Sequence, residues 1–145
     1  MHATFVRRSL SAELARALLD AAEAKASALG LAISVTVVDE SGVLKAYARM
    51  DGAALVAEGA SRKKALTAVG FGIPTGEAWH SFIKDDPILM HGAPQLDHFI
   101  LLGGGLPIRV EGQLVGAIGV SGGHYHQDEA CARAALEAVG LGGAG

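Results

Sequence analysis

The sequence has one cysteine, few aromatic residues and no long apolar run, and each shortage excludes a class of protein. A lone Cys131 rules out an internal disulfide and any metal site built from several thiolates. No apolar run approaches the roughly 20 residues needed to cross a bilayer, and the N-terminus shows no apolar core of a secretory signal. We therefore expect a cytoplasmic protein that has no membrane as a partner.

The charge balance excludes a second class. A net charge of −3 at pH 7, with both signs interspersed, provides no basic surface for nucleic acid. Aromatic residues make up only 5% of the chain, which leaves few rings for stacking bases. A small molecule is the partner that this composition favours.

Hydrophobic residues are abundant: they form 50% of the 145 residues, and mean hydropathy is +0.34. This composition predicts one folded domain over residues 1–145 with a sizeable core. Cys131 lies on the inner side of the last helical pattern, so we expect it to be a small buried residue rather than a reactive thiol.

Periodicity and turn residues predict alternating helices and strands, which together indicate an α+β fold with an antiparallel sheet. Ser11 is a plausible N-cap for the first helix, and Glu40-Ser41-Gly42 is the turn of a hairpin in which Asp39 caps the turn. The expected helices are residues 12–29, 55–70, a short one after Pro74, and 127–139; the expected strands are 31–39, 43–49, 98–102, 106–110 and 114–120; and 84–96 is expected to be a loop or lid.

The segment from residue 112 to residue 129 carries the densest polar cluster. An apolar strand pattern runs into Gly122-Gly123, and His124, His126, Asp128 and Glu129 follow at the start of a helix. Imidazole and carboxylate together suit a divalent metal, for which His124 and His126 are the candidate ligands. His124, Asp128 and Glu129 could instead move protons as catalytic groups. The plainer alternative is a charged helix start with two solvated histidines.

Three basic or acidic residues are candidates to bind a carboxylate ligand. Arg49 ends the second expected strand, and Asp51 follows in a turn. Arg49 could present its guanidinium to a ligand carboxylate or a haem propionate, or it could pair with Asp51, Asp39 or Glu129. Lys64, within Arg62-Lys63-Lys64, is the one of three adjacent cations best placed to point inward, where it would hold an anion, act as a base or form a salt bridge.

Three successive glycines, Gly103, Gly104 and Gly105, precede Leu106-Pro107. They lack the lysine and the following helix of a phosphate loop. Their backbone N–H groups could form a small anion nest or an oxyanion hole. A sharp bend between strands is the alternative.

Several blocks of the sequence, in order and spacing, resemble the GlcG/HbpS family, which includes the C-terminal domain of PduO-type proteins. The resemblance covers residues 9–140. The blocks that carry it are Val38-Asp39-Glu40-Ser41-Gly42, Arg49-Met50-Asp51-Gly52, Lys64-Ala65, Pro74-Thr75, residues 103–108 (GGGLPI), residues 115–123 (VGAIGVSGG) and Gln127-Asp128-Glu129.

The resemblance implies a profilin-like fold with a five-stranded antiparallel sheet and assembly into homo-oligomers. It also implies two functions, because some members bind haem whereas others lie in catabolic operons and are associated with small organic acids. The haem-binding HbpS type is exported, and this chain shows no export signal. The segment with His80, His91 and His98 matches no family motif, so these histidines are proposed rather than transferred as haem ligands, with apolar walls between Trp79 and Met90.

Three functions therefore stay open, and whether the protein is an enzyme is undecided. Non-covalent haem binding leads, because the family resemblance and the histidine-bearing segment both favour it. The alternative is an isomerase, tautomerase or hydrolase of a small carboxylate, with Arg49 and Lys64 binding the acid and the glycines steadying an oxyanion. The third is a non-catalytic oligomeric accessory protein.

Overall fold

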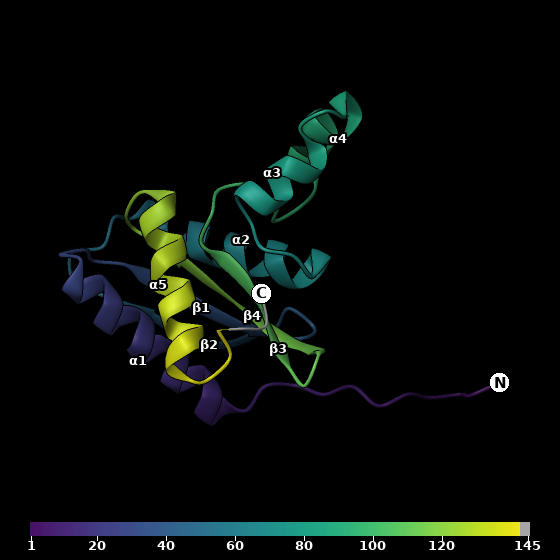
Figure 1. The fold of residues 1–145 in the computed structure, drawn as a ribbon, viewed down its shortest axis with the longest axis horizontal. Helices are drawn as coiled ribbons and strands as arrows, with labels where there is room; N and C mark the ends of the chain where they lie inside the picture. The colour runs from purple at the N-terminus through teal and green to yellow at the C-terminus, as the bar shows by residue number, and fades with distance from the viewer. Residues whose placement is uncertain (143–145) are drawn as a thin grey trace.

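The computed structural model describes residues 1–142, which form one antiparallel sheet with helices on both faces (Figure 1). The sheet has the order β2-β1-β4-β3. In chain order the elements are α1 (Ala12–Ala28), β1 (Ser34–Asp39), β2 (Leu44–Arg49), α2 (Val56–Phe71), α3 (Glu77–Ile83), α4 (Pro87–Gly92), a 3-10 turn (Ala93–Gln95), β3 (Gly105–Val110), β4 (Gln113–Ser121) and α5 (Tyr125–Ala138).

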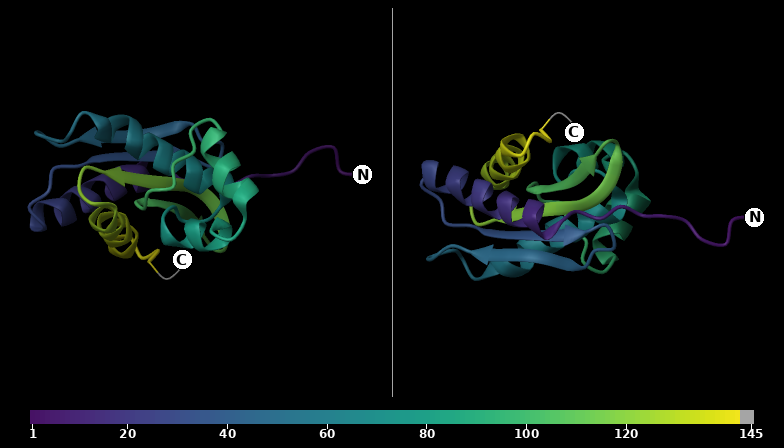
Figure 2. Two further views of the ribbon diagram at one scale, coloured as in Figure 1. Left: turned by 90° about the horizontal axis from the view of Figure 1, so that it is seen from above. Right: turned by 90° about the horizontal axis from the view of Figure 1, so that it is seen from below.

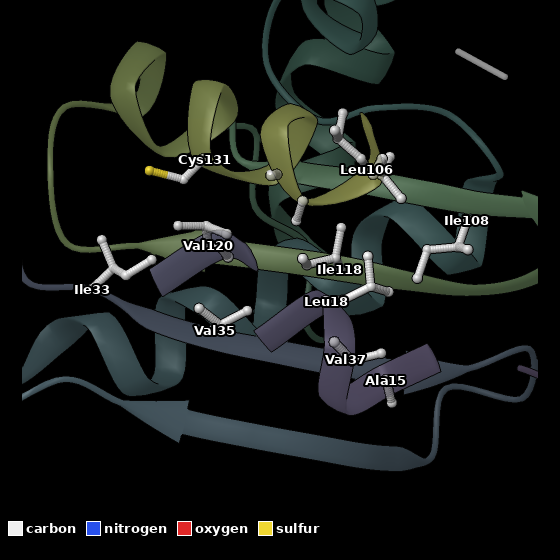
Figure 3. Close-up of a cluster of buried hydrophobic side chains, with 14 of the residues drawn as sticks. Ala15, Leu18, Ile33, Val35, Val37, Leu106, Ile108, Ile118, Val120 and Cys131 are labelled. Atoms are coloured by element: carbon white, nitrogen blue, oxygen red, sulfur yellow. The ribbon is translucent and has the colours of Figure 1, made fainter. Parts of the chain in front are cut away.

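Helices α1 and α5 cover one face of the sheet, and α2 covers the other (Figure 1; Figure 2 gives two further views). Strand residues point alternately to the two faces, so Val35 and Val37 join the core under α1 and α5, whereas Val38 packs against α2. Figure 3 shows the larger core, in which Cys131 of α5 lies among buried aliphatic side chains. Burial raises the pKa of the Cys131 thiol, as an inert structural cysteine requires.

Small residues determine how closely α2 approaches the sheet. Gly119 of β4 and Gly105 of β3 are register partners on adjacent strands, and both face α2. A Cβ on Gly119 would collide with the carbonyl oxygen of Ser61, and one on Gly105 would collide with that of Lys64. Backbone therefore packs directly on backbone at this point, which brings the Lys64 side chain close to the end of β4.

The α+β class, the hairpin and most element boundaries are confirmed. Asp39 caps the hairpin turn as predicted, since its Oδ1 accepts hydrogen bonds from the N–H groups of Ser41 (2.9 Å) and Val43 (3.0 Å). Ser11 caps α1 by accepting from the Leu14 N–H at 3.0 Å. No helix in the described part of the chain is both long and apolar enough to cross a membrane.

Three predictions of local structure were wrong. The described residues form four strands and not five, because residues 98–102 are not a strand: His98 has a φ of 63°, and the Ile100 N–H donates to Thr67 Oγ1 of α2 at 3.0 Å. Residues 84–96 are not a plain loop, because Asp86 caps a short helix that has Pro87 in its first turn. Helix α5 also starts two residues earlier than predicted, at Tyr125.

Replacing Gly119 with alanine tests the close packing of α2. We expect Gly119→Ala to lower the free energy of unfolding by about 3 kcal/mol, because the added methyl group must push α2 away from the sheet. The control is Gly59→Ala, which lies in α2 itself. An added Cβ there meets open space, and alanine favours the helix. Urea unfolding followed by circular dichroism compares the two variants. A Gly119→Ala protein as stable as wild type would contradict this account of the packing.

Candidate functional site

A buried ion pair joins three elements behind the polar cluster. Lys64 of α2 extends its ammonium to Asp128 of α5, with Nζ 3.0 Å from Oδ2, and donates to the carbonyl oxygen of Val120 in β4 at 2.9 Å. Each side chain is only 2% exposed. Lys64 does turn inward as predicted, but toward a carboxylate and a carbonyl.

Asp128 also fixes the turn that precedes its own helix. Its second oxygen, Oδ1, accepts a hydrogen bond from the Gly123 N–H at 2.9 Å. The carboxylate lies in the first turn of α5, where the helix dipole favours negative charge. Both oxygens of Asp128 are thus engaged, one by a cation and one by the backbone.

Burial lowers the pKa of Lys64, and the charge and hydrogen bond of Asp128 oppose that shift. Among the described residues the ammonium has two acceptors, and its burial makes it depend on them rather than on water. Both residues are closed to solvent, so their chemistry is that of a buried structural pair.

Gly104 and Gly105 pack against residues of this ion pair, and Gly103 lies against Tyr125 and Glu129. Gly104 has a φ of 125°, and a Cβ there would lie 2.5 Å from the Val120 carbonyl oxygen and 3.1 Å from Lys64 Cδ. Gly105 donates its N–H to Thr75 Oγ1 at 2.9 Å. A positive φ and close packing explain Gly104, whereas close packing alone explains Gly105, whose N–H is already used within the protein.

The two histidines of the cluster lie together at the start of α5. His124 is the N-cap, and its Nδ1 accepts from the His126 N–H at 3.2 Å. Gln127 completes a capping box by accepting from the His124 N–H at 3.0 Å. Within residues 1–142, no group of three or more His, Cys, Asp or Glu side chains is arranged to hold a metal ion. The histidines form a pair without a third such ligand.

The remaining polar candidates lie at the surface. Glu129 is partly exposed and pairs with Arg133 one helical turn later, with 2.7 Å between Oε1 and NH2. Arg49 and Asp51 are exposed at the end of edge strand β2. Arg49 forms none of its three predicted ion pairs within the described residues. The structure therefore joins Lys64 to Asp128 but leaves Arg49 and Asp51 outside that pair.

A small cleft of about 240 Å³ opens between α3 and the start of α5. His80 and Glu77 contribute from α3, and Tyr125 contributes from α5. His126 Nε2 lies 3.5 Å from Glu77 Oε1, which links the two helices beside the cleft. The glycine run reaches this cleft through Gly103.

A larger cavity of about 690 Å³ lies beside α2, on the side away from α1 and α5. His98 lines it, whereas His91 is exposed on α4 and does not. Sequence reasoning missed Arg7, which no helix or strand pattern distinguishes. The full lining is Arg7, Glu40, Ser41, Gly42, Leu66, Thr67, Val69, Gly70, Phe71, Leu96, Asp97, His98, Phe99 and Leu114.

Aromatic packing supports one wall of this cavity from behind. Trp79 of α3 packs on Phe71 and Phe99, at ring-centroid distances of 4.7 and 5.8 Å. Phe71 and Phe99 line the cavity, but Trp79 does not. None of the apolar residues between Trp79 and Met90 lines this cavity, and its apolar lining comes from α2, residues 96–99 and β4.

Removing the Asp128 carboxylate tests the importance of the buried pair. We expect Asp128→Ala to lower the free energy of unfolding by about 3–5 kcal/mol, because it leaves the buried Lys64 ammonium without its carboxylate partner. Glu129→Gln is the matched control at the next position, where an exposed i,i+4 pair contributes only about 0.3–0.5 kcal/mol. Chemical unfolding of both variants makes the comparison. If the two losses are equal, the pair does not hold the elements together.

Comparison with known proteins agrees with this architecture. Residues 10–137 match the model of the family described as haem degrading protein HbpS-like. Protein GlcG of Escherichia coli (strain K12) is 35% identical over 112 residues, which cover 77% of this chain and 81% of GlcG.

Solved structures agree as well. A crystal structure of HbpS has a TM-score of 0.86 at 30% identity, covering 95% of both chains. A crystal structure of a PduOC–heme complex has a TM-score of 0.80 at 29% identity, covering 91% of this chain and 96% of that one. The chain therefore belongs to the HbpS-like family, as the resemblance in its sequence predicted.

Proposed function

We propose that the protein binds haem non-covalently in the large cavity, with His98 as the iron ligand. The observation that carries the proposal is the coincidence of an imidazole with a cavity of about 690 Å³. That volume lies within the range of small-molecule and cofactor sites, roughly 300–1,000 Å³. The cleft beside His80, at about 240 Å³, lies below it.

The lining of the large cavity fits an amphipathic macrocycle. Leu66, Phe99 and Leu114 provide apolar and aromatic surface for the ring, and an exposed imidazole is a common axial ligand of haem iron. Bound haem would supply a redox-active iron centre. The chain's own part is to present the imidazole and to shield the ring from water.

The backbone around His98 is fixed by α2. Thr67 Oγ1 lies 3.0 Å from the His98 carbonyl oxygen and 2.8 Å from that of Lys63, either of which can accept its one proton, and it accepts from the Ile100 N–H. His98 itself has a φ of 63°, which is uncommon outside glycine and recurs at functional sites. Thr67 thus orients a strained residue so that its side chain borders the cavity.

The relatives support the proposal by name. The family is described as haem degrading, and one solved relative is a PduOC–heme complex. These names concern those proteins. For this chain they make haem the first ligand to test.

A specific observation favours a second function, an enzyme that acts on a small carboxylate. The cleft between α3 and α5 brings the titratable side chains of His80, Glu77 and Tyr125 around one small space. In this alternative, proton transfer falls to the groups that line the cleft, because Asp128 and Lys64 are buried and His124 Nδ1 caps α5. A screen of small keto and unsaturated acids, with His80→Ala as the variant, tests it.

We infer in addition that the chain forms a homo-oligomer. Leu55 and Val56, at the start of α2, are 89% and 75% exposed. Large apolar side chains side by side at the surface are typical of association sites. The oligomer is compatible with haem binding, with catalysis and with an accessory role.

Titration with haem tests the proposed function. We expect saturable binding near one haem per subunit with a sharp Soret band, and His98→Ala should shift that band and weaken binding at least tenfold, because the iron loses its ligand. His91→Ala is the control, since His91 does not line the cavity. Absence of a saturable band with wild type would overturn haem binding. An unchanged His98→Ala spectrum would overturn the ligand assignment.

A further inference from the structure

The N-terminal arm, residues 1–10, runs along the body and then away from it (Figures 1 and 2). It contains no helix or strand, yet its last residues are fastened. Leu10 is buried and donates its N–H to the Val115 carbonyl oxygen at 3.2 Å, and Arg8 pairs with Glu111 at 2.7 Å. These contacts fix the point at which the arm meets the large cavity, and Arg7 lies at that point.

Two side chains of opposite charge meet the cavity there. Arg7 has no carboxylate within ion-pair distance in the described part of the chain, and its guanidinium lies 5.4 Å from the centre of the Phe5 ring. Glu40, which also lines the cavity, accepts a hydrogen bond from Ser41 through Oε1, at 3.2 Å. Glu40 Oε2 is buried and has no hydrogen-bond partner among residues 1–142.

These groups leave hydrogen-bonding capacity unused at one end of the cavity. A guanidinium has five N–H donors in a planar fork, and none is committed to a carboxylate here. A buried oxygen without a partner is costly in a finished structure, which is why such atoms often indicate an absent binding partner. Ser9 and, more weakly, Arg7 lower the pKa of Glu40 against the effect of burial, so Glu40 keeps its negative charge.

We propose that Arg7 of the N-terminal arm binds the carboxylates of the ligand, and that the arm is one wall of the ligand site. This inference rests on the proposed haem binding and adds the chemistry that orients the ring. Haem has an apolar ring and two propionates on one edge. Leu66, Phe99 and Leu114 give the cavity apolar walls, and its charged lining residues are Arg7, Glu40 and Asp97. Arg7 is the one arginine or lysine among the described residues that line it, so the propionate edge would face the arm.

Arg7 suits this role better than Arg49, the arginine that sequence reasoning selected. Arg49 is exposed on edge strand β2 and does not line the cavity. Arg7 can lie between two carboxylates, that of Glu40 and that of the ligand, because its fork donates in several directions. The partner that Glu40 Oε2 lacks would then be Arg7 itself, drawn in by the ligand.

The test compares haem with haem dimethyl ester, whose propionates carry no charge. We expect Arg7→Ala to weaken haem binding about tenfold, the loss of one charge-assisted contact. The same variant should leave the affinity for the ester and the Soret maximum unchanged, since His98 still holds the iron. Arg8→Ala is the matched control: it removes the neighbouring cation, which pairs with Glu111 and does not line the large cavity.

The outcomes separate the two proposals. If wild type binds neither haem nor its ester, the proposed function fails and this inference fails with it. If wild type binds haem and Arg7→Ala binds it equally well, only the inference fails. Equal losses for haem and ester, or equal losses in Arg7→Ala and Arg8→Ala, would also overturn it, because they would indicate a general disturbance of the arm.

Discussion

The buried contact between Lys64 and Asp128 is the constraint on which the rest of the structure depends. It connects α2 on one face of the sheet with α5 on the other, passing the end of β4. Removing two charges from water is costly, and only close geometry and further hydrogen bonds offset that cost. The Val120 carbonyl and the Gly123 N–H supply those hydrogen bonds. The relative positions of α2, β4 and α5 follow from satisfying this pair.

The glycines follow from the same constraint. For the Lys64 side chain to reach Asp128, α2 must lie close to the sheet, and this requires glycine at positions 105 and 119. Gly104 then covers the pair, and its positive φ turns the chain into β3. Helix α2 also carries Leu66, Thr67 and Phe71 to the large cavity. Packing around the ion pair thereby positions one wall of the proposed ligand site.

Local patterns predicted the fold well where local forces decide it. Three features could be predicted from local sequence, because turn chemistry, capping and periodicity act over a few residues. They are the hairpin around Ser41, the cap at Ser11 and the inward direction of Lys64 on α2. Residues 98–102 failed for the opposite reason. Their apolar pattern is that of a strand, but the Ile100 N–H donates to Thr67 and the Leu101 carbonyl accepts from Gly76, both distant in the chain and neither in the sheet. Tertiary contacts overrode the local preference.

The candidate site was less predictable than the fold. Lys64, Asp128 and the glycines were selected as candidate binding or catalytic residues, yet no spacing rule shows that Lys64 and Asp128 would meet as a buried pair. Arg7 was missed because nothing in an extended arm indicates which cavity it borders. Conversely, Arg49 and Asp51 have the chemistry of a binding site but lie at an exposed strand end. The chemistry of a side chain can be read from the local sequence, whereas which side chains come together depends on the whole fold.

Two separate regions thus emerge: a sealed ionic core that holds the elements, and an open cavity bordered by α2, the His98 segment and the N-terminal arm. The first is structural, and the second is where we propose that the ligand binds. A crystal structure of the protein grown with haem tests this division most directly. The account predicts a haem in the cavity beside α2, with its iron on the His98 imidazole. Haem bound instead in the cleft beside His80, with the large cavity empty, would contradict it.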